Sequence, residues 1–106
     1  MDITSTKRLN NGVEIPVLGL GVYKSGENTK NAVLNAFKAG YRMIDTASVY
    51  GNEAYVGQAM RESKLPRREI FITTKIWNDD LRAKRTREAA MESLDRLGLD
   101  LSLIHI

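Results

Sequence analysis

Three residues of this sequence could together transfer a proton: Asp45, Tyr50 and Lys75. Asp45 ends an apolar run, and Tyr50 follows it in a Gly-Asn turn that precedes a predicted helix. Lys75 ends the next apolar run, EIFITTK. Because side chains at the carboxyl ends of parallel strands face the same open mouth of an α/β sheet, we expect the three groups to meet there.

The three groups complement one another chemically. A free tyrosine has a pKa near ~10 and is a poor proton donor at neutral pH, whereas a nearby ammonium favours the phenolate and lowers that pKa. We expect Lys75 to act on Tyr50 in this way, and Asp45 to keep the lysine charged and in place. Tyr50 would then be a general acid for an oxygen that gains negative charge, as in the reduction of a carbonyl group.

The composition is that of an ordinary soluble globular chain, with 106 residues, 42% of them hydrophobic and 27% charged. We expect one domain over residues 1–106. The sequence has no cysteine and one histidine, so neither a disulfide framework nor a metal site is predicted. The chain starts without a signal-peptide pattern, and no apolar run approaches the ~20 residues of a membrane span. We therefore expect a cytoplasmic protein with no membrane partner.

A cluster of basic residues raises the question of nucleic acid. The net charge is +3, and the cluster consists of Arg82, Lys84, Arg85 and Arg87. No aromatic residues alternate with these basic residues to stack on bases. We therefore interpret the cluster as the solvated face of a helix and predict no nucleic-acid partner.

Turn signals and periodicity divide the chain into a hairpin followed by alternating strands and helices. Asn11-Gly12 is typical of a tight hairpin turn, here between residues 5–9 and 13–17. We expect strands at 17–20, 41–45, 70–75 and 101–104, and helices at 28–39, 53–63 and 82–97. The strand ends at residues 21, 45 and 75 lie 24 and 30 residues apart, the spacing of repeated strand–helix units with parallel strands.

Some residues have predicted structural roles within these elements. Asn52 is placed to cap the helix at 53–63, and Gly40 and Gly98 to end the helices before them. We expect both faces of the strand at 70–75 to be buried. The apolar stripe expected on the last helix consists of Thr86, Ala90, Leu94 and Leu97.

Three successive motifs resemble the aldo-keto reductase family: GLGVY at 19–23, IDTASVYGNE at 44–53 and TKIW at 74–77. The similarity runs from about Thr6 to Asp100 and is closest to the bacterial glyoxal reductases and diketogluconate reductases. A complete barrel of this family takes roughly 250 residues. The resemblance therefore implies an α/β fold that is an incomplete (β/α)8 TIM barrel, with the hairpin, about three β/α units and the start of a fourth strand.

The resemblance also assigns roles to individual residues. Asp45, Tyr50 and Lys75 match three of the family's four catalytic positions, with Tyr50 as the proton donor. The cofactor, expected to be NADPH, would lie at Gly21, Val22, Tyr23 and Asp45. The substrate, expected to be a small carbonyl compound, would lie at Tyr23, Tyr50 and Trp77. Trp77 could equally be a lid over the core. The intact parent protein is expected to be monomeric.

His105 matches the fourth catalytic position by type, since an imidazole there orients and polarises the substrate carbonyl. In the family, however, the histidine lies three residues further along than His105 lies from Asp100, and the Trp-Pro pair that follows it is absent here. Two interpretations stay open. Either His105 is functional, or the match is accidental and residues 101–106 are not native to the protein.

Three functional hypotheses follow. The first is the NADPH-dependent reduction of small dicarbonyls or sugar-derived ketones by the intact parent. The second is a non-catalytic relative that binds nicotinamide as a regulatory subunit, and the presence of both Tyr50 and Lys75 argues against it. The third, which we favour for the 106-residue chain by itself, is an inactive fragment with weak cofactor binding. We expect weak binding because, in the family, the contacts to the phosphates of the cofactor come mostly from later strands and loops.

Overall fold

A computed structural model describes residues 3–99 and 103–105 of the chain. Its strands are β1 (Thr6–Arg8), β2 (Glu14–Pro16), β3 (Leu20–Gly21), β4 (Met43–Asp45), β5 (Phe71–Lys75) and β6 (Leu103–His105). Its α-helices are α1 (Thr29–Ala39), α2 (Glu53–Ser63), α3 (Asn78–Arg82) and α4 (Thr86–Leu97). Short 3-10 helices are η1 (Gly26–Asn28), η2 (Ser48–Tyr50) and η3 (Arg67–Glu69).

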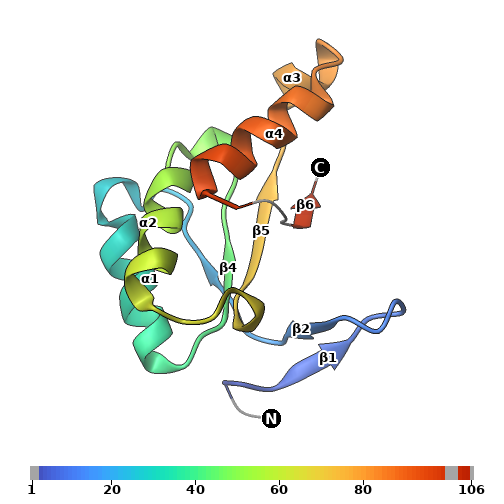
Figure 1. The fold of residues 1–106 in the computed structure, drawn as a ribbon. Helices are drawn as coiled ribbons and strands as arrows, with labels where there is room; N and C mark the ends of the chain where they lie inside the picture. The colour runs from blue at the N-terminus through green and yellow to red at the C-terminus, as the bar shows by residue number, and fades with distance from the viewer. Residues whose placement is uncertain (1–2, 100–102, 106) are drawn as a thin grey trace.

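The expected hairpin is present at the start of the chain. β1 and β2 pair antiparallel, with Thr6 opposite Pro16. The Leu9 N–H donates to the Val13 carbonyl at 2.7 Å, and Gly12 in the turn has a φ of 87°, a left-handed conformation that glycine adopts without strain. In Figure 1 the hairpin projects from the lower end of the molecule, away from α3.

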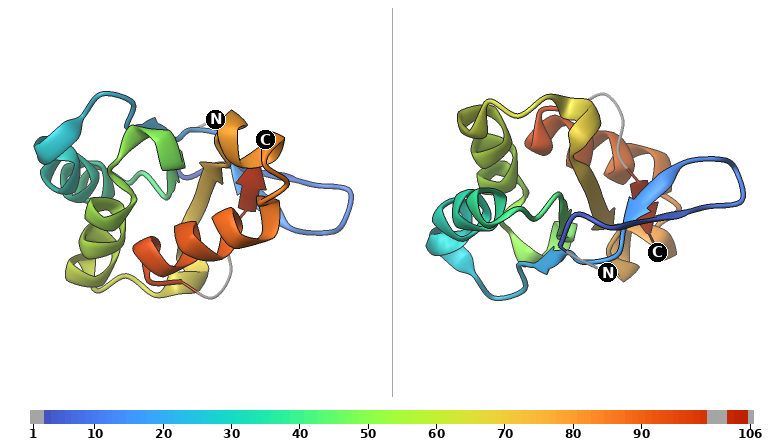
Figure 2. Two further views of the ribbon diagram at one scale, coloured as in Figure 1. Left: turned by 90° about the horizontal axis from the view of Figure 1, so that it is seen from above. Right: turned by 90° about the horizontal axis from the view of Figure 1, so that it is seen from below.

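The remaining strands form one parallel sheet in the order β3-β4-β5-β6. Its register aligns Gly21 with Asp45 and Asp45 with Thr73, so the strands end at about the same level. The helices α1, α2 and α4 form an arc along one face of this sheet, and α2 packs against both of the others. The result is a repeated strand–helix arrangement with the strand ends at the edge where α3 lies (Figures 1 and 2).

The hydrophobic core lies between the sheet and the three helices. Ile44 and Ile72 are the sheet's largest fully buried side chains, and they meet apolar residues of all three helices. The buried core residues are Val22, Val33, Phe37, Ile44, Val56, Ala59, Met60, Ile70, Ile72 and Leu97. No helix in the described ranges is long and apolar enough to span a bilayer.

The first parallel strand lies later than the predicted range 17–20. Val17 donates its N–H to the Ser5 carbonyl and so continues the hairpin, and β3 is limited to Leu20 and Gly21. Gly19 crosses close to β4, where a Cβ would come within 2.6 Å of the Met43 methyl carbon. Of the predicted strand residues, Val17 therefore extends the hairpin, Leu18 and Gly19 connect the two elements, and Leu20 alone lies in β3.

The long helix predicted at 82–97 is wrong at its start. The chain forms α3, breaks at Ala83–Arg85, and begins α4 at Thr86. Lys84 has a φ of 57°, and the Arg85 N–H and guanidinium both bond Asp80. This local turn interrupts a segment whose residue types favour a helix.

Two burial predictions also need correction. On α4 the fully buried positions are Ala89, Ser93 and Leu97, whereas Thr86 is exposed. In β5 half-buried residues alternate with buried ones, so both faces are not equally covered. The buried residues of β5 face the helices, and the half-buried ones, including Lys75, lie on the opposite face.

By contrast, α1 and α2 agree with the prediction. α1 buries Val33, Ala36 and Phe37, and α2 buries Val56, Ala59 and Met60. Gly40 ends α1 in the left-handed conformation with a φ of 106°. Gly98 ends α4 in the same way, with a φ of 72°. These glycine stops are confirmed because only glycine adopts such a φ without cost.

Candidate active site

Lys75 lies at the centre of a cluster of polar groups at the carboxyl ends of β4 and β5. Its Nζ is 2.8 Å from Asp45 Oδ2, 3.1 Å from the Thr46 carbonyl oxygen and 3.4 Å from the Tyr50 hydroxyl oxygen. The same Nζ is 5.2 Å from the centroid of the Tyr50 ring. The structure therefore brings together the three residues that the sequence predicted to meet.

The backbone explains how these groups reach one another. Asp45 is the last residue of β4 and Lys75 the last of β5, and the two strands are adjacent and parallel. The other Asp45 oxygen accepts a hydrogen bond from the Thr73 hydroxyl, so both oxygens of this carboxylate have partners. Asp45 is thus oriented from β5 by two side chains of that strand.

The Lys75 ammonium is stabilised in its charged form. Burial acts to lower its pKa, but hydrogen bonds to Asp45 and Tyr50, and the charges of both groups, outweigh burial and raise the pKa above its ordinary value. The lysine side chain is 31% exposed and that of Asp45 40% exposed, so the ion pair remains open to solvent and to a ligand.

Tyr50 comes from a different kind of element. It ends η2, and Gly51 follows it with a φ of 70°. The Ser48 hydroxyl at the start of η2 donates to the Lys75 carbonyl at 3.1 Å, which ties this turn to the end of β5. The phenol is therefore held beside the ammonium by a tight turn and not by a strand.

Tyr23 covers Tyr50 on one side. Their ring centroids are 5.1 Å apart with the planes tilted by 45°, and the Lys24 ammonium lies 5.3 Å from the Tyr23 centroid. Tyr23 remains 64% exposed, while its neighbour Val22 is fully buried. A Cβ added to Gly21 would meet no atom within 4 Å, so the space beside this strand end is open.

These features suit a flat ring ligand. The open space at Gly21 and the exposed face of Tyr23 adjoin the Asp45–Lys75 pair, and exposed aromatic faces favour stacking of planar groups. The predicted cofactor positions Gly21, Val22, Tyr23 and Asp45 thus lie at one edge of the sheet, although Val22 offers only its backbone.

Asn52 does not cap α2 with its side chain as predicted. Its Oδ1 accepts a hydrogen bond from the Thr46 hydroxyl at 2.6 Å, and its Nδ2 donates to the Val22 carbonyl at 2.8 Å. Asn52 is fully buried. The amide therefore joins two strand ends, and the Val22 carbonyl also accepts a hydrogen bond from the Ser25 N–H at 3.2 Å.

Sequence reasoning missed a second buried network beside the site. Glu53 is 1% exposed, accepts a hydrogen bond from the Thr74 hydroxyl at 2.6 Å and pairs with the Arg96 guanidinium at 2.7 Å. Arg96 also donates to the Ser93 hydroxyl. A signal was present, because strand alternation turns Thr74 toward the helices, where a hydroxyl needs a partner.

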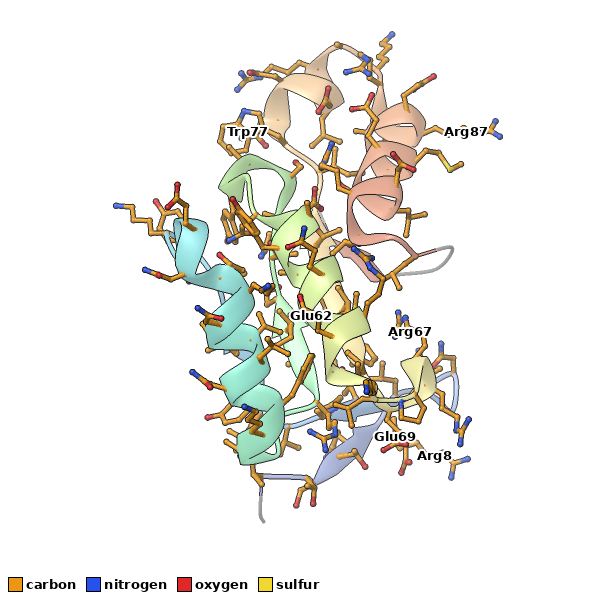
Figure 3. All side chains as sticks on the ribbon, turned by 60° about the vertical axis from the view of Figure 1, so that its left-hand side comes forward. Arg8, Glu62, Arg67, Glu69, Trp77 and Arg87 are labelled. Atoms are coloured by element: carbon orange, nitrogen blue, oxygen red, sulfur yellow. The ribbon has the colours of Figure 1, made fainter. Side chains whose placement is uncertain are left out.

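Trp77 follows Lys75 by two residues and lies in the turn between β5 and α3. It is 43% exposed and lines a cavity of about 380 Å³ with Ser48, Val49 and Arg96. Figure 3 shows Trp77 at the end of the molecule opposite Arg8 of the hairpin. A larger cavity of about 660 Å³ between α2 and α4 is lined by none of the predicted site residues. The substrate role of Trp77 stays a prediction.

The backbone of His105 also ends at the site. His105 is the last residue of β6, and its Cα is paired with that of Lys75 in the parallel register. The first two residues of the predicted strand at 101–104 lie outside the described residues, and so does Ile106. Strand position thus places His105 at the correct edge, while its catalytic role stays a prediction.

Comparison with known proteins identifies a related family. A model described as the aldo/keto reductase family matches residues 17–106. Morphine 6-dehydrogenase of Pseudomonas putida is 52% identical over 92% of this chain and 34% of its own length. Glyoxal reductase of Bacillus subtilis is 47% identical over 97% of this chain and 39% of its own length. The chain thus spans little more than a third of the length of these curated relatives.

Solved structures agree with the sequence matches. An aldo/keto reductase from Brucella melitensis superimposes with a TM-score of 0.92 and 45% identity, covering 100% of this chain and 42% of that one. The Bombyx mori aldo-keto reductase in complex with NADP gives a TM-score of 0.87 and 37% identity, covering 96% of this chain and 37% of that one. The predicted fold, part of a (β/α)8 barrel with an N-terminal hairpin, is therefore confirmed.

Proposed function

The chain belongs to the aldo/keto reductase family, and from that premise we propose that its parent protein reduces aldehydes and ketones to alcohols with NADPH. The observation that carries the proposal is the position of Lys75 Nζ, within 3.4 Å of both the Asp45 carboxylate and the Tyr50 hydroxyl. An acid, an ammonium and a phenol in contact form a proton-donating group beside an open edge of the sheet.

Tyr50 holds the proton that the carbonyl oxygen of the substrate would receive. As that proton leaves, negative charge develops on the Tyr50 oxygen, and the Lys75 ammonium at 3.4 Å stabilises it electrostatically. Asp45 keeps the ammonium in position and charged. General-acid catalysis of this kind is worth about 10²–10⁴ in rate.

The cofactor is proposed to lie at Gly21, Val22, Tyr23 and Asp45. Bound there, the reduced nicotinamide would supply a hydride to the carbonyl carbon. The open space at Gly21 and the exposed Tyr23 ring support this assignment, as does the Bombyx mori relative with its NADP. Together with Tyr50, Tyr23 and Trp77 would contact the substrate, and His105 is kept as a candidate that polarises its carbonyl.

The substrate class proposed is small dicarbonyls or sugar-derived ketones, supported by the 47% identity to a glyoxal reductase. We further propose that the parent is a cytoplasmic monomer that acts on small molecules and not on nucleic acid. Steady-state kinetics with methylglyoxal and with a bulky polycyclic ketone tests the substrate class. A higher kcat/KM for the polycyclic ketone would contradict it.

The decisive test of the reaction is Tyr50→Phe in a protein that carries this segment in its intact barrel. The change keeps the ring and removes the proton, so NADPH consumption should slow by about a hundredfold or more. Cofactor affinity, measured by calorimetry, should change little. Tyr55→Phe in α2 is the matched control, since it removes a half-buried phenol hydroxyl outside the site and should keep turnover. Undiminished turnover in Tyr50→Phe would refute the assignment.

A further inference from the structure

Asn52 joins two strand ends that carry different site residues. Its carboxamide is fully buried, with Nδ2 on the Val22 carbonyl of the β3 end and Oδ1 on the Thr46 hydroxyl of the β4 end. Val22 directly precedes Tyr23, and Thr46 directly follows Asp45. One side chain thus fixes the distance between the backbone of the aromatic residue and the backbone of the carboxylate.

The same connection extends to the remaining site groups. The Thr46 carbonyl accepts a hydrogen bond from Lys75 Nζ, and Asn52 itself lies two residues after Tyr50. The Val22 N–H in turn donates to the Asp45 carbonyl at 3.1 Å, so Asn52 reinforces a single direct backbone bond between β3 and β4 beyond the short strand pairing. Loss of the amide would leave the Tyr23 segment held by that backbone bond and by the buried Val22 side chain.

We propose that Asn52 is a positioning residue that holds the Tyr23 ring against Tyr50 and beside the Asp45–Lys75 pair. It acts through the Val22 and Thr46 backbone segments and touches no reacting group. Its consequence for catalysis rests on the proposed reductase function, whereas its consequence for the Tyr23–Tyr50 contact does not. Without it, the open space at Gly21 would lose its defined wall.

The residue type is specific to this task. The asparagine amide donates from Nδ2 to the Val22 carbonyl and accepts at Oδ1 from the Thr46 hydroxyl, so each of its polar atoms matches its partner. An ionised aspartate can only accept hydrogen bonds, at both of its oxygens, and a leucine side chain can neither donate nor accept one. Loss of the amide removes the acceptor of the buried Thr46 hydroxyl at a cost of about 1–3 kcal/mol, whereas the Val22 carbonyl keeps its bond from the Ser25 N–H, so we expect substitutions to destabilise the fold.

A neighbouring bond provides a matched control. Thr74 is as fully buried as Thr46, and its hydroxyl donates at the same distance of 2.6 Å, but to Glu53 and not to Asn52. Thr74→Val therefore removes a comparable buried hydrogen bond at the same end of α2 without touching the Val22 side. A general loss of packing would affect both variants alike.

The first experiment measures the ring contact by NMR in the 106-residue chain. Asn52→Ala should abolish the nuclear Overhauser effects between Tyr23 and Tyr50 ring protons, while Thr74→Val should lower the free energy of unfolding and retain them. Circular dichroism checks that both variants keep the helices. Full retention of the Tyr23–Tyr50 effects in a folded Asn52→Ala variant would overturn the proposal.

If the alanine variant does not fold, the Asn52→Asp variant tests whether residue 52 holds the Tyr23 ring against Tyr50. Below its pKa the introduced carboxyl can donate to the Val22 carbonyl and accept from Thr46, so the ring contact should be present. Above that pKa the carboxylate repels the Val22 carbonyl, so the contact should be lost, a change that the unsubstituted chain should not show over the same pH range. Burial raises the pKa of such a carboxyl and moves the change toward neutral pH. A contact independent of pH would contradict the inference.

Kinetics of an intact reductase that carries the segment supply the catalytic readout. Asn52→Ala should lower kcat/KM for the carbonyl up to about a hundredfold, as displacement of a positioned group by ~1 Å does. The reduction should persist at saturating NADPH, which a purely structural loss of stability would not cause. If Tyr50→Phe abolishes turnover and a folded Asn52→Ala does not change it, the positioning inference fails while the proposed function stands.

Discussion

At the scale of single residues, the site depends on the number of hydrogen-bond donors that lysine has. An ammonium has three N–H groups, and those of Lys75 have three acceptors: the Asp45 carboxylate, the Thr46 carbonyl and the Tyr50 hydroxyl. A guanidinium would match this geometry poorly, because its donors lie in a fixed plane. The lysine is therefore held in one orientation, with its charge directed at the phenol oxygen.

This arrangement predicts a pH dependence of stability. Because the folded state raises the pKa of Lys75 above its ordinary value of 10.5, the ammonium stabilises the fold fully below pH 10.5. That contribution is lost as the pH rises through the higher folded pKa. Urea unfolding of the chain and of Lys75→Met should therefore show a difference in unfolding free energy that is constant near neutral pH and shrinks above about pH 10.5.

The control for this prediction is Lys38→Met, which removes an exposed lysine of α1. Its difference from the unsubstituted chain should stay small across the same pH range, since surface substitutions change stability by about 0.5 kcal/mol or less. Other groups that titrate at high pH and lie away from Lys75 are common to all three chains and cancel in the comparison. A Lys75→Met difference that does not change with pH would show that the ammonium is not stabilised by its partners.

At the scale of elements, α2 connects the ends of the strands to the other helices. Its first residues bond the ends of β3, β4 and β5, and its middle packs on α4. The close approach depends on Gly57, where a Cβ would come within 2.4 Å of the Leu97 carbonyl oxygen. Gly57 is thus required for packing, although glycine is a poor helix former.

Gly57→Ala should therefore destabilise the fold. Alanine improves helix propensity by about 1 kcal/mol, but the new methyl group meets backbone atoms that cannot rotate away. Overpacking of this kind costs about 1–3 kcal/mol, and we expect the midpoint of urea unfolding to fall. Gln58→Ala, at the next and exposed position, gains propensity without a clash and should leave the midpoint equal or higher. Equal midpoints for both variants would mean that α4 moves freely away from α2.

Most elements could be predicted from the sequence where a local signal was strong. The Asn11-Gly12 turn, the glycine stops and the periodicity of α1 and α2 each depend on residues close in the chain. The break at Ala83–Arg85 could not be predicted, because its turn includes no glycine or proline and places Lys84 at a φ of 57°, a conformation that other residue types rarely adopt. Val17 belonged to both the predicted hairpin at 13–17 and the predicted strand at 17–20, and its bond to the Ser5 carbonyl assigns it to the hairpin.

The candidate site shows the same division. The meeting of Asp45, Tyr50 and Lys75 could be predicted, because parallel strands align their ends and the motif spacing defines which residues lie there. The partners of Asn52 and Glu53 could not, since each bonds side chains or backbone from two other elements. The sequence identifies the residues at a strand end, whereas the hydrogen-bond partners of the buried residues beside them depend on how the elements pack.

At the scale of the whole molecule, the described residues form a slab of 41 × 35 × 22 Å with its helices on one face of the sheet. Asp45 and Lys75 lie on the other face and remain 40% and 31% exposed. Ligand sites usually bury 70–90% of a ligand about the size of a drug, which requires walls on several sides. In this chain the segments that could enclose a ligand at this edge are the Tyr23 segment, η2 and the turn at Trp77.

We therefore expect the 106-residue chain to bind NADPH weakly. The proposed contacts at Gly21, Val22, Tyr23 and Asp45 reach one flat ring, while a dinucleotide also carries phosphates that need cationic or N–H partners. Lys75 at this edge is already paired with Asp45, and Lys24, which lies over the Tyr23 ring, is one exposed ammonium that contributes little. Isothermal calorimetry at micromolar NADPH should detect no saturable heat for this chain, with the Bombyx mori relative as the positive control. A micromolar or tighter Kd would show that the strand ends alone form the main part of the cofactor site.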